Sequence, residues 1–235
     1  MGTFLDFIKN NFGHAAPILA AGILALTIIL DRARALYVTY PLRDMPGFFD
    51  RLNEYVFTGK MTEAVAFCDR HATKPAARVI KQALLRADEP EELLRNAVEL
   101  SVNESVQALQ KRTSFLAMIA NVATLLGLFG TIAGLISSFE AVSQADAQQK
   151  SALLADGIST AMNATMMGLG VAIPCMVAFS FLIQRQNQLI SEVDQAALRI
   201  FDLLKSRSLY GDKLRRERPV TNGALRMAEG ERAVA

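Results

Sequence analysis

The chain has 235 residues, of which 51% are hydrophobic, with a formal net charge of +2 and a mean hydropathy of +0.24. At this length a positive mean hydropathy favours a membrane protein over one or two water-soluble domains. Cys68, Cys175, His14 and His71 are isolated in the sequence, and no catalytic triad, phosphate-binding loop or zinc motif is present. These features argue against an enzyme and against a bound metal. We also expect no cofactor and no nucleic-acid partner.

The first part of the chain predicts two membrane-associated segments. Residues 1–11 place four apolar side chains among acidic and basic ones, which is typical of an amphipathic helix on the membrane surface. Residues 12–30 are apolar and predict the first transmembrane helix. Positive charge follows this helix, at Arg32 and Arg34, which is the reverse of a secretory signal peptide and places the N-terminus outside.

Residues 31–114 carry charges of both signs, are punctuated by prolines and show no strand alternation, so they predict a water-exposed helical region. This region holds 13 of the 25 Lys and Arg residues, and residues 184–235 hold another ten. Because cytoplasmic loops are enriched in these residues, both regions are expected in the cytoplasm. No proline lies within 91–139, which predicts one unbroken helix from the cytoplasmic region into the membrane.

Residues 115–139 carry no charge and predict the second transmembrane helix, followed by a polar, net acidic periplasmic loop at 140–156. Small residues recur in this helix at steps of three and four, which places them on one helix face where another helix can approach closely. They are Thr124, Gly127, Thr131, Gly134 and Ser138. This seam has two interpretations: helix packing alone, or a path on which the hydroxyl of Thr131 contacts a passing ion.

Residues 157–183 are a run of 27 residues without a charge and predict the third transmembrane helix. Polar residues occupy its first third. Pro174 has no N–H to offer the carbonyl of Gly170, so we expect a mild kink there. An apolar helical pattern continues into the cytoplasm over 184–205, and the charged tail at 206–235 is expected to be disordered.

The polar residues of the third span lie on opposite faces of its helix. Asn163 is about 160° from Thr165 around the helix axis, taking 100° per residue. A polar side chain in a membrane helix needs a partner, so this helix is expected to be enclosed on several sides, which favours an oligomer. Asn163 then bonds a neighbouring helix while Thr165 faces an inner cavity, or the two roles are reversed. Thr160 is a further candidate for an inter-helix contact or the ion path.

Neither polar span contains Asp, Glu, Lys, Arg or His. Threonine hydroxyls can solvate an ion or relay a hydrogen bond, but their pKa is too high for them to load and unload a proton at physiological pH. A proton-driven cycle through these spans therefore needs a titratable group from another chain.

Two motifs resemble those of the MotA/TolQ/ExbB proton channel family, LLGLFGTIAGLISSF at 125–139 and GISTAMNATMMGLGVAIP at 157–174. The residues that match the family's Gly-Thr and A-T-x-x-G patterns are Gly130, Thr131, Ala164, Thr165 and Gly168. Three spans and a large cytoplasmic helical region resemble the TolQ/ExbB branch more than the four-span stators of the same family.

The resemblance implies an all-α membrane protein with three transmembrane helices, two of them extended into a cytoplasmic helical bundle, assembled as a pentamer in the bacterial inner membrane. It also implies two copies of an ExbD- or TolR-like single-span partner, whose membrane Asp takes the coupling ion, H⁺ or Na⁺. Thr131 and Thr165 then line the ion path, and ion flow drives a rotation that reaches the periplasm through the partner. The residues assigned to helix packing are Gly127, Gly130, Gly134, Gly168, Gly170 and Pro174. Many TolQ and ExbB proteins have Glu where this chain has Thr160, which leaves proton against sodium coupling open.

Two other functions fit parts of the sequence. A membrane scaffold would bind partners through the cytoplasmic helices and conduct nothing. A stand-alone channel is a weaker interpretation because no charged ring or filter motif is present. Substitution of Thr131 and Thr165 separates these functions, since a scaffold should tolerate Ala or Val at both positions.

Overall fold

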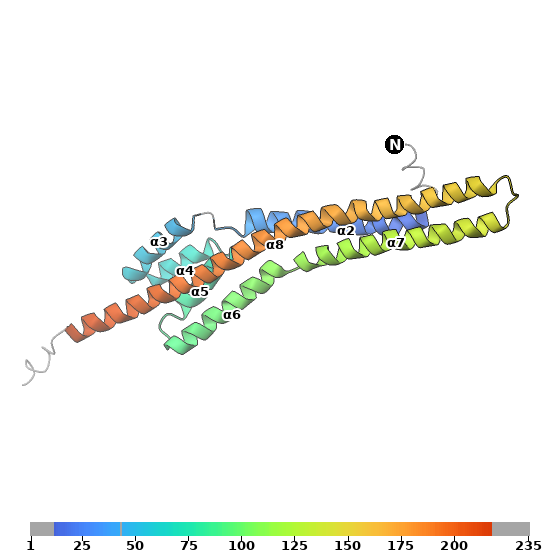
Figure 1. The fold of residues 1–235 in the computed structure, drawn as a ribbon. Coiled ribbons are helices and arrows are strands. Elements are labelled where there is room, and N and C mark those ends of the chain that lie inside the picture. The colour runs from blue at the N-terminus through green and yellow to red at the C-terminus, as the bar shows by residue number, and fades with distance from the viewer. Residues whose placement is uncertain (1–11, 43, 218–235) are drawn as a thin grey trace, which may run out of the picture. The chain divides into compact units, whose positions relative to one another are not determined.

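The computed structural model describes residues 12–42 and 44–217, and within these residues the chain forms helices and no strand. The elements in order are α2 (Phe12–Arg34), the π-helix η1 (Ala35–Thr39), α3 (Met45–Phe57), α4 (Met61–Asp69), α5 (Pro75–Leu85), α6 (Glu91–Gln110), α7 (Thr113–Ser143) and α8 (Lys150–Glu217) (Figure 1). Three helical segments of the described chain are long and apolar enough to cross a membrane. The all-α fold with three membrane helices is therefore confirmed, while the surface helix predicted at 1–11 lies outside the described residues.

The chain divides into two compact units. The membrane unit comprises the described residues up to Pro41 together with Val106–Ser191. The head unit comprises Leu42–Ser105 and the described residues from Glu192 onward. Helices α6 and α8 contribute residues to both units.

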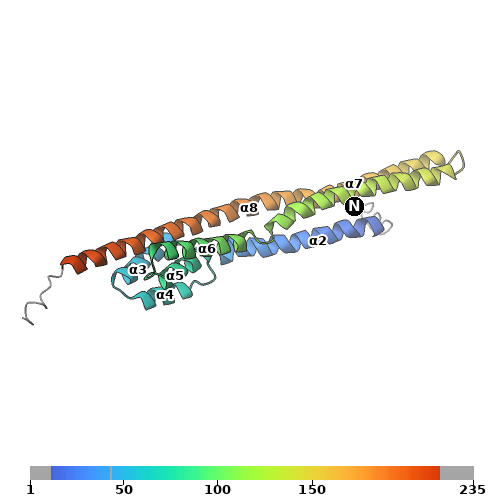
Figure 2. The same ribbon diagram turned by 90° about the horizontal axis from the view of Figure 1, so that it is seen from below.

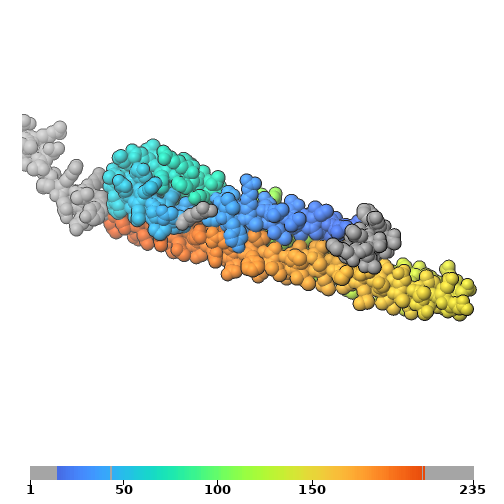
Figure 3. Space-filling model, turned by 90° about the horizontal axis from the view of Figure 1, so that it is seen from above, coloured from blue at the N-terminus to red at the C-terminus, as the bar shows by residue number. Residues whose placement is uncertain are grey.

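In the membrane unit, α2, α7 and the first part of α8 run side by side (Figure 1), and α2 lies along α8 in the space-filling view (Figure 3). Ala15 and Ile18 of α2 are buried in one cluster with Ala164 and Met167 of α8. The outward side chains of α7 and α8 are large, apolar and exposed; they include Leu125, Phe129, Ile132, Met162, Met166 and Ile173. Such a surface is stable against lipid or another membrane helix rather than against water.

In the head unit, α3, α4 and α5 lie beside α6 and the last part of α8 (Figure 2). Its core consists of fully buried aliphatic side chains, among them Leu52, Val56, Val79, Ile80 and Ile200. Local signals in the sequence explain the helix starts. The carboxylate of Asp44 accepts a hydrogen bond from the N–H of Gly47 at 3.0 Å, and Pro75 occupies the first position of α5.

The unbroken helix predicted over 91–139 is wrong. Helix α6 ends at Gln110 and α7 begins at Thr113, with Arg112 between them in the left-handed conformation, φ 65°. A left-handed residue other than Gly is disfavoured by about 1–2 kcal/mol, so tertiary contacts have to stabilise this turn. One such contact places Nη1 of Arg112 3.6 Å from the carboxylate of Asp31 on α2.

Several predicted boundaries also fall inside helices. The predicted loop at 140–156 is mostly helical, since α7 runs to Ser143 and α8 begins at Lys150. The residues there are largely good helix formers with no proline among them, which explains the extension. Helix α2 likewise passes residue 30, where the first span was predicted to end, and reaches Arg34.

The disordered tail predicted from residue 206 is wrong for 206–217, which form the end of α8. The helical region predicted at 184–205 is therefore longer than expected. No proline occurs in 206–217, so nothing in the backbone ends the helix earlier. The remaining residues of that predicted tail lie outside the described part of the chain.

Candidate functional site

The seam of small residues on α7 lies against α8. A Cβ atom added to Gly127 would lie 3.2 Å from the Cα atom of Gly168, and one added to Gly134 would lie 3.3 Å from the Cα atom of Ala161. These are tight contacts with backbone atoms, so the two helices are as close as glycine allows.

Helix α8 presents a matching seam, which the sequence interpretation missed. Its residues are Gly157, Ala161, Ala164 and Gly168. They recur at steps of four, three and four, so the spacing that marked α7 was also visible here. A Cβ atom added to Gly168 would lie 2.7 Å from the carbonyl oxygen of Ala123, and one added to Gly130 would lie 2.7 Å from the Cβ atom of Ala164.

Gly170 does not belong to this interface. A Cβ atom added to Gly170 would meet no atom within 4 Å. Two residues along an α-helix correspond to about 200°, so Gly170 points away from the face that carries Gly168. Gly170 therefore does not pack against α7 in the single chain, and a packing role against a neighbouring chain stays a prediction. Pro174 is exposed and lies inside α8, which continues on both sides of it, and the kink stays a prediction.

Thr131 of α7 and Thr165 of α8 meet across the seam, and their hydroxyl groups are hydrogen bonded to each other. The Thr131 hydroxyl also lies 3.1 Å from the carbonyl oxygen of Gly127 and 3.4 Å from that of Ala161. The Thr165 hydroxyl lies 3.4 Å from the same Gly127 oxygen. Both threonines are half-buried. The close approach at Gly127 is what brings the two hydroxyl groups together.

The hydroxyl pair has more acceptor sites than hydrogens. Each hydroxyl carries one hydrogen and two lone pairs. When Thr131 donates to the carbonyl of Gly127, Thr165 can donate to Thr131, and the lone pairs of the Thr165 oxygen stay open. That oxygen can then accept a hydrogen bond from a protonated carboxyl group or contribute to the coordination of a dehydrated cation.

Thr160 and Asn163 do not join the hydrogen bonds of this pair within the described residues. Both are half-buried on α8. Thr165, rather than Asn163, is the residue that the structure brings to the interface with α7. The contacts of Thr160 and Asn163 with a neighbouring chain stay predictions.

The two spans that carry the pair offer no carboxylate and no basic side chain, since 115–139 and 157–183 contain no Asp, Glu, Lys, Arg or His. Among the described residues, no group of three or more His, Cys, Asp or Glu side chains is arranged to hold a metal. The threonine pair can therefore solvate an ion, but the charge that holds a proton at this depth has to come from elsewhere.

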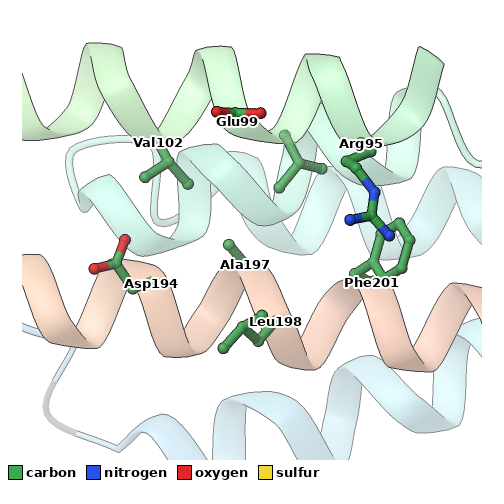
Figure 4. Close-up of a pocket in the computed structure, with 8 residues that line it drawn as sticks. Arg95, Glu99, Val102, Asp194, Ala197, Leu198 and Phe201 are labelled. Carbon is green, nitrogen blue, oxygen red and sulfur yellow. The ribbon is translucent and has the colours of Figure 1, made fainter. Parts of the chain in front are cut away.

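The head unit has a groove of about 360 Å³ between α6 and α8 (Figure 4). The guanidinium of Arg95 stacks on the ring of Phe201, with Cζ 5.2 Å from the ring centre. Two carboxylates, those of Glu99 and Asp194, and the exposed Leu198 complete its charged and apolar lining.

The part of the chain that matches known proteins includes the Thr131–Thr165 pair. The profile of the MotA/TolQ/ExbB proton channel family matches residues 71–195. The chain is 32% identical over 203 residues to the Tol-Pal system protein TolQ of Haemophilus influenzae, covering 78% of this chain and 86% of the relative. It is 33% identical over 183 residues to the putative biopolymer transport protein ExbB-like 3 of Synechocystis, covering 76% and 85%. The TolQ of Pseudomonas aeruginosa is 30% identical over 121 residues, 52% of each chain.

The matched range contains both seams as well as the Thr131–Thr165 pair. The described chain has three helical segments able to cross a membrane, and its relatives are named TolQ and ExbB-like. The chain therefore belongs to the MotA/TolQ/ExbB proton channel family, in its TolQ/ExbB branch, and is a multi-pass inner-membrane protein of energy transduction.

Proposed function

We propose that this chain is the channel subunit of an inner-membrane motor driven by an ion-motive force. Together with an ExbD- or TolR-like single-span partner, it couples the flow of protons or sodium ions to mechanical work in the cell envelope. The observation that carries the proposal is the hydroxyl pair of Thr131 and Thr165, set between two spans that contain no carboxylate and no basic side chain. Such a pair suits an ion that is bound by a carboxylate from another chain.

The hydroxyl pair fits both protonation states of a partner carboxyl group. A hydroxyl can accept a hydrogen bond from the protonated acid and, after turning its hydrogen, donate one to the ionised carboxylate. In a low-dielectric site the loss of such a bond is unfavourable by about 1–3 kcal/mol. Thr131 and Thr165 thus lower the barrier for a carboxyl group that gains and loses its proton as it passes.

The assembly in this proposal is a ring of five copies around two partner helices. The support for a ring is the large apolar surface of α7 and α8, which needs cover by lipid and by other helices. The half-buried Thr160 and Asn163 then contact a neighbouring copy or the partner. The basic regions 31–114 and 184–235 lie in the cytoplasm and the N-terminus in the periplasm.

The names of the relatives support work across the envelope, since one is a Tol-Pal system protein and another a biopolymer transport protein. We include outer-membrane transport, envelope integrity and gliding motility as the processes that this motor would drive. Whether the ion is H⁺ or Na⁺ is decided by measuring flux with each ion in turn.

The test replaces Thr131 or Thr165 by Val, which keeps the volume of the side chain and removes the hydroxyl. We expect each variant to assemble with its partner while ion flux into proteoliposomes falls about tenfold or more, because the carboxyl group loses a hydrogen-bond partner. Thr124→Val is the matched control. Its hydroxyl bonds only the carbonyl of Ala120, at 3.0 Å and one turn back, among the described contacts, so flux should stay near the wild-type value.

The scaffold alternative makes the opposite prediction for the same variants. A scaffold that conducts nothing should keep partner binding and cellular activity in Thr131→Val and Thr165→Val alike. Full activity in both would reduce the threonines to packing residues. Loss of flux without loss of partner binding would exclude the scaffold.

A further inference from the structure

The end of α2 contains a buried charge whose hydrogen bonds are not all made within the described residues. Arg32 is only 4% exposed, and its Nε and Nη1 atoms are covered without forming a hydrogen bond. Burial of a guanidinium group without hydrogen bonds is strongly unfavourable. An additional anion would stabilise a guanidinium group in this state, and the described residues do not provide one.

One carboxylate is shared between two guanidinium groups at this position. The Oδ2 atom of Asp31 lies 3.9 Å from Nε of Arg32 and 3.6 Å from Nη1 of Arg112. Both distances exceed that of a hydrogen bond. Since Asp31 carries one negative charge at most, the group formed by Asp31, Arg32 and Arg112, here called the arginine cluster, has a net positive charge.

The other two membrane helices bring further polar atoms to the same end of the bundle. Thr113 follows Arg112 at the start of α7, and its buried hydroxyl has no hydrogen-bond partner. On α8, the Cζ atom of Arg185 lies 5.8 Å from the ring centre of Tyr37 in η1. The next residue, Gln186, is buried with its Oε1 atom unbonded. On α2, α7 and α8 alike, a buried polar side chain near this level therefore has an atom without a hydrogen bond: Arg32, Thr113 and Gln186.

The position of the cluster selects the kind of anion. It lies just after the apolar run at 12–30, where Asp31 and Arg32 begin the charged part of the chain, and basic residues at such a position suit the depth of lipid headgroups. Basic groups between membrane helices at this depth suit the phosphate of a headgroup. Asp31 and Arg112 are each about half exposed, at 54% and 56% of their side chains, so a ligand can reach the cluster from this edge. A cation is excluded because the cluster is already positive.

We propose that the arginine cluster is a phosphate-binding site in which Arg32 and Arg112 hold one phosphate group, from an anionic phospholipid headgroup or from free phosphate. The phosphate supplies the negative charge and the acceptor oxygens that the buried guanidinium lacks. Because the bound group touches α2 and the turn before α7, it holds these two helices together. This site is separate from the threonine pair and does not depend on ion flux.

The test uses the full-length protein in nanodiscs of phosphatidylcholine alone, of phosphatidylcholine with phosphatidylglycerol, and of phosphatidylcholine with added inorganic phosphate. Retained lipid is measured by native mass spectrometry after transfer to detergent, and stability by the thermal unfolding midpoint. We expect wild type to retain phosphatidylglycerol and to unfold at a higher temperature with it. Arg112→Gln should lower that retention about fivefold, as expected for one basic residue at a membrane surface.

Arg32→Gln should show the same loss, and Arg112→Gln keeps the test valid if Arg32→Gln fails to fold, since Arg112 is exposed. Lys150→Gln is the control, because it removes one exposed charge at the first residue of α8, far along the helix from Gln186. Stabilisation by inorganic phosphate without phosphatidylglycerol would assign the site to free phosphate. Absence of both effects in wild type, or equal loss in Lys150→Gln, would overturn the proposal.

Discussion

The close helix contacts inside the membrane unit and the core inside the head unit are formed by residues of different size. At the close contacts between α7 and α8 in the membrane unit the residues are small, namely Ala123, Gly127, Gly130, Gly134, Ala161, Ala164 and Gly168. In the head unit the buried residues are large, among them Phe48, Leu52, Val79, Ile80 and Ile200. The same chain thus uses close backbone approach in one place and bulky side chains in the other.

The solvent explains the difference. In water, each large apolar side chain that is buried adds a favourable free energy, about 1.5–3 kcal/mol for Val, Leu, Ile or Phe. In lipid, an exposed Leu is already in an apolar environment, so helices gain little by burying it and associate through close packing and hydrogen bonds. Many large side chains of α7 and α8 are accordingly exposed, while small residues form the close contacts between the helices; Leu116, Ile119, Met167 and Leu182 are large side chains that are buried.

Replacement of Ile80 by Ala is the largest perturbation that we predict for the head unit. Ile80 is fully buried, so the change should lower the free energy of unfolding by about 3 kcal/mol through lost burial and the cavity that remains. Hydrogen exchange of head-unit amides gives the measurement. Leu85→Ala, at an exposed position of the same helix, should change it by less than about 0.5 kcal/mol. Equal effects at both sites would contradict a head-unit core in which Ile80 is buried and Leu85 is exposed.

Addition of one methyl group should have the next largest effect, this time in the membrane unit. The new Cβ atom of Gly168→Ala would meet the backbone of α7, including the Cα atom of Gly127 at 2.9 Å, so the helices have to separate. We expect a loss of about 2 kcal/mol, measured as a lower thermal midpoint in detergent. Gly170→Ala adds the same methyl group into open space and should be neutral or slightly stabilising. Similar losses in both variants would mean that close approach does not hold this interface together.

Sequence alone was sufficient for features that depend on composition along one helix. Uncharged runs predicted the three spans, and steps of three and four predicted the face of α7 that carries Gly127 and Thr131. The same spacing on α8 was present but overlooked, because two of its four members are alanines, which are common in any helix. The position of Thr165 opposite Thr131 needed the relative rotation of two helices, which only tertiary structure supplies.

Features that arise from contacts between distant segments could not be predicted. The break between α6 and α7 has no Gly or Pro to mark it, and Arg112 adopts its left-handed conformation where it contacts Asp31. Burial of Arg32 was equally hidden, since an Arg just after a span usually indicates only a cytoplasmic end. Both outcomes result from packing of α2 against α7, segments about 80 residues apart in the sequence.

The smallest effect that we predict concerns a charge on the surface of the head unit, where neither packing nor close approach is involved. Asp69 forms an ion pair with Lys81, and both side chains are partly exposed. Asp69→Asn should change the free energy of unfolding by less than about 1 kcal/mol, and less still at high salt, because water and salt screen such pairs. Chemical denaturation at low and high salt checks this, and a loss of several kcal/mol would contradict it.

The neighbouring thiol gives a second measurement on the same variant. Burial, and to a lesser extent Asp69, raises the pKa of the Cys68 thiol from 9.0 to about 12. The folded protein thus holds the proton more tightly than the unfolded chain, so this contribution to stability is complete below pH 9 and is lost as the pH rises towards 12. Since burial is the main cause, the pKa in Asp69→Asn should fall only slightly and stay above 9. In a Cys175→Ala background, Cys68 should therefore react with a maleimide at pH 8 far more slowly than in urea, with or without Asp69. Rapid reaction of the folded Asp69→Asn variant would mean that the surface charge, rather than the packed core, keeps this thiol protonated.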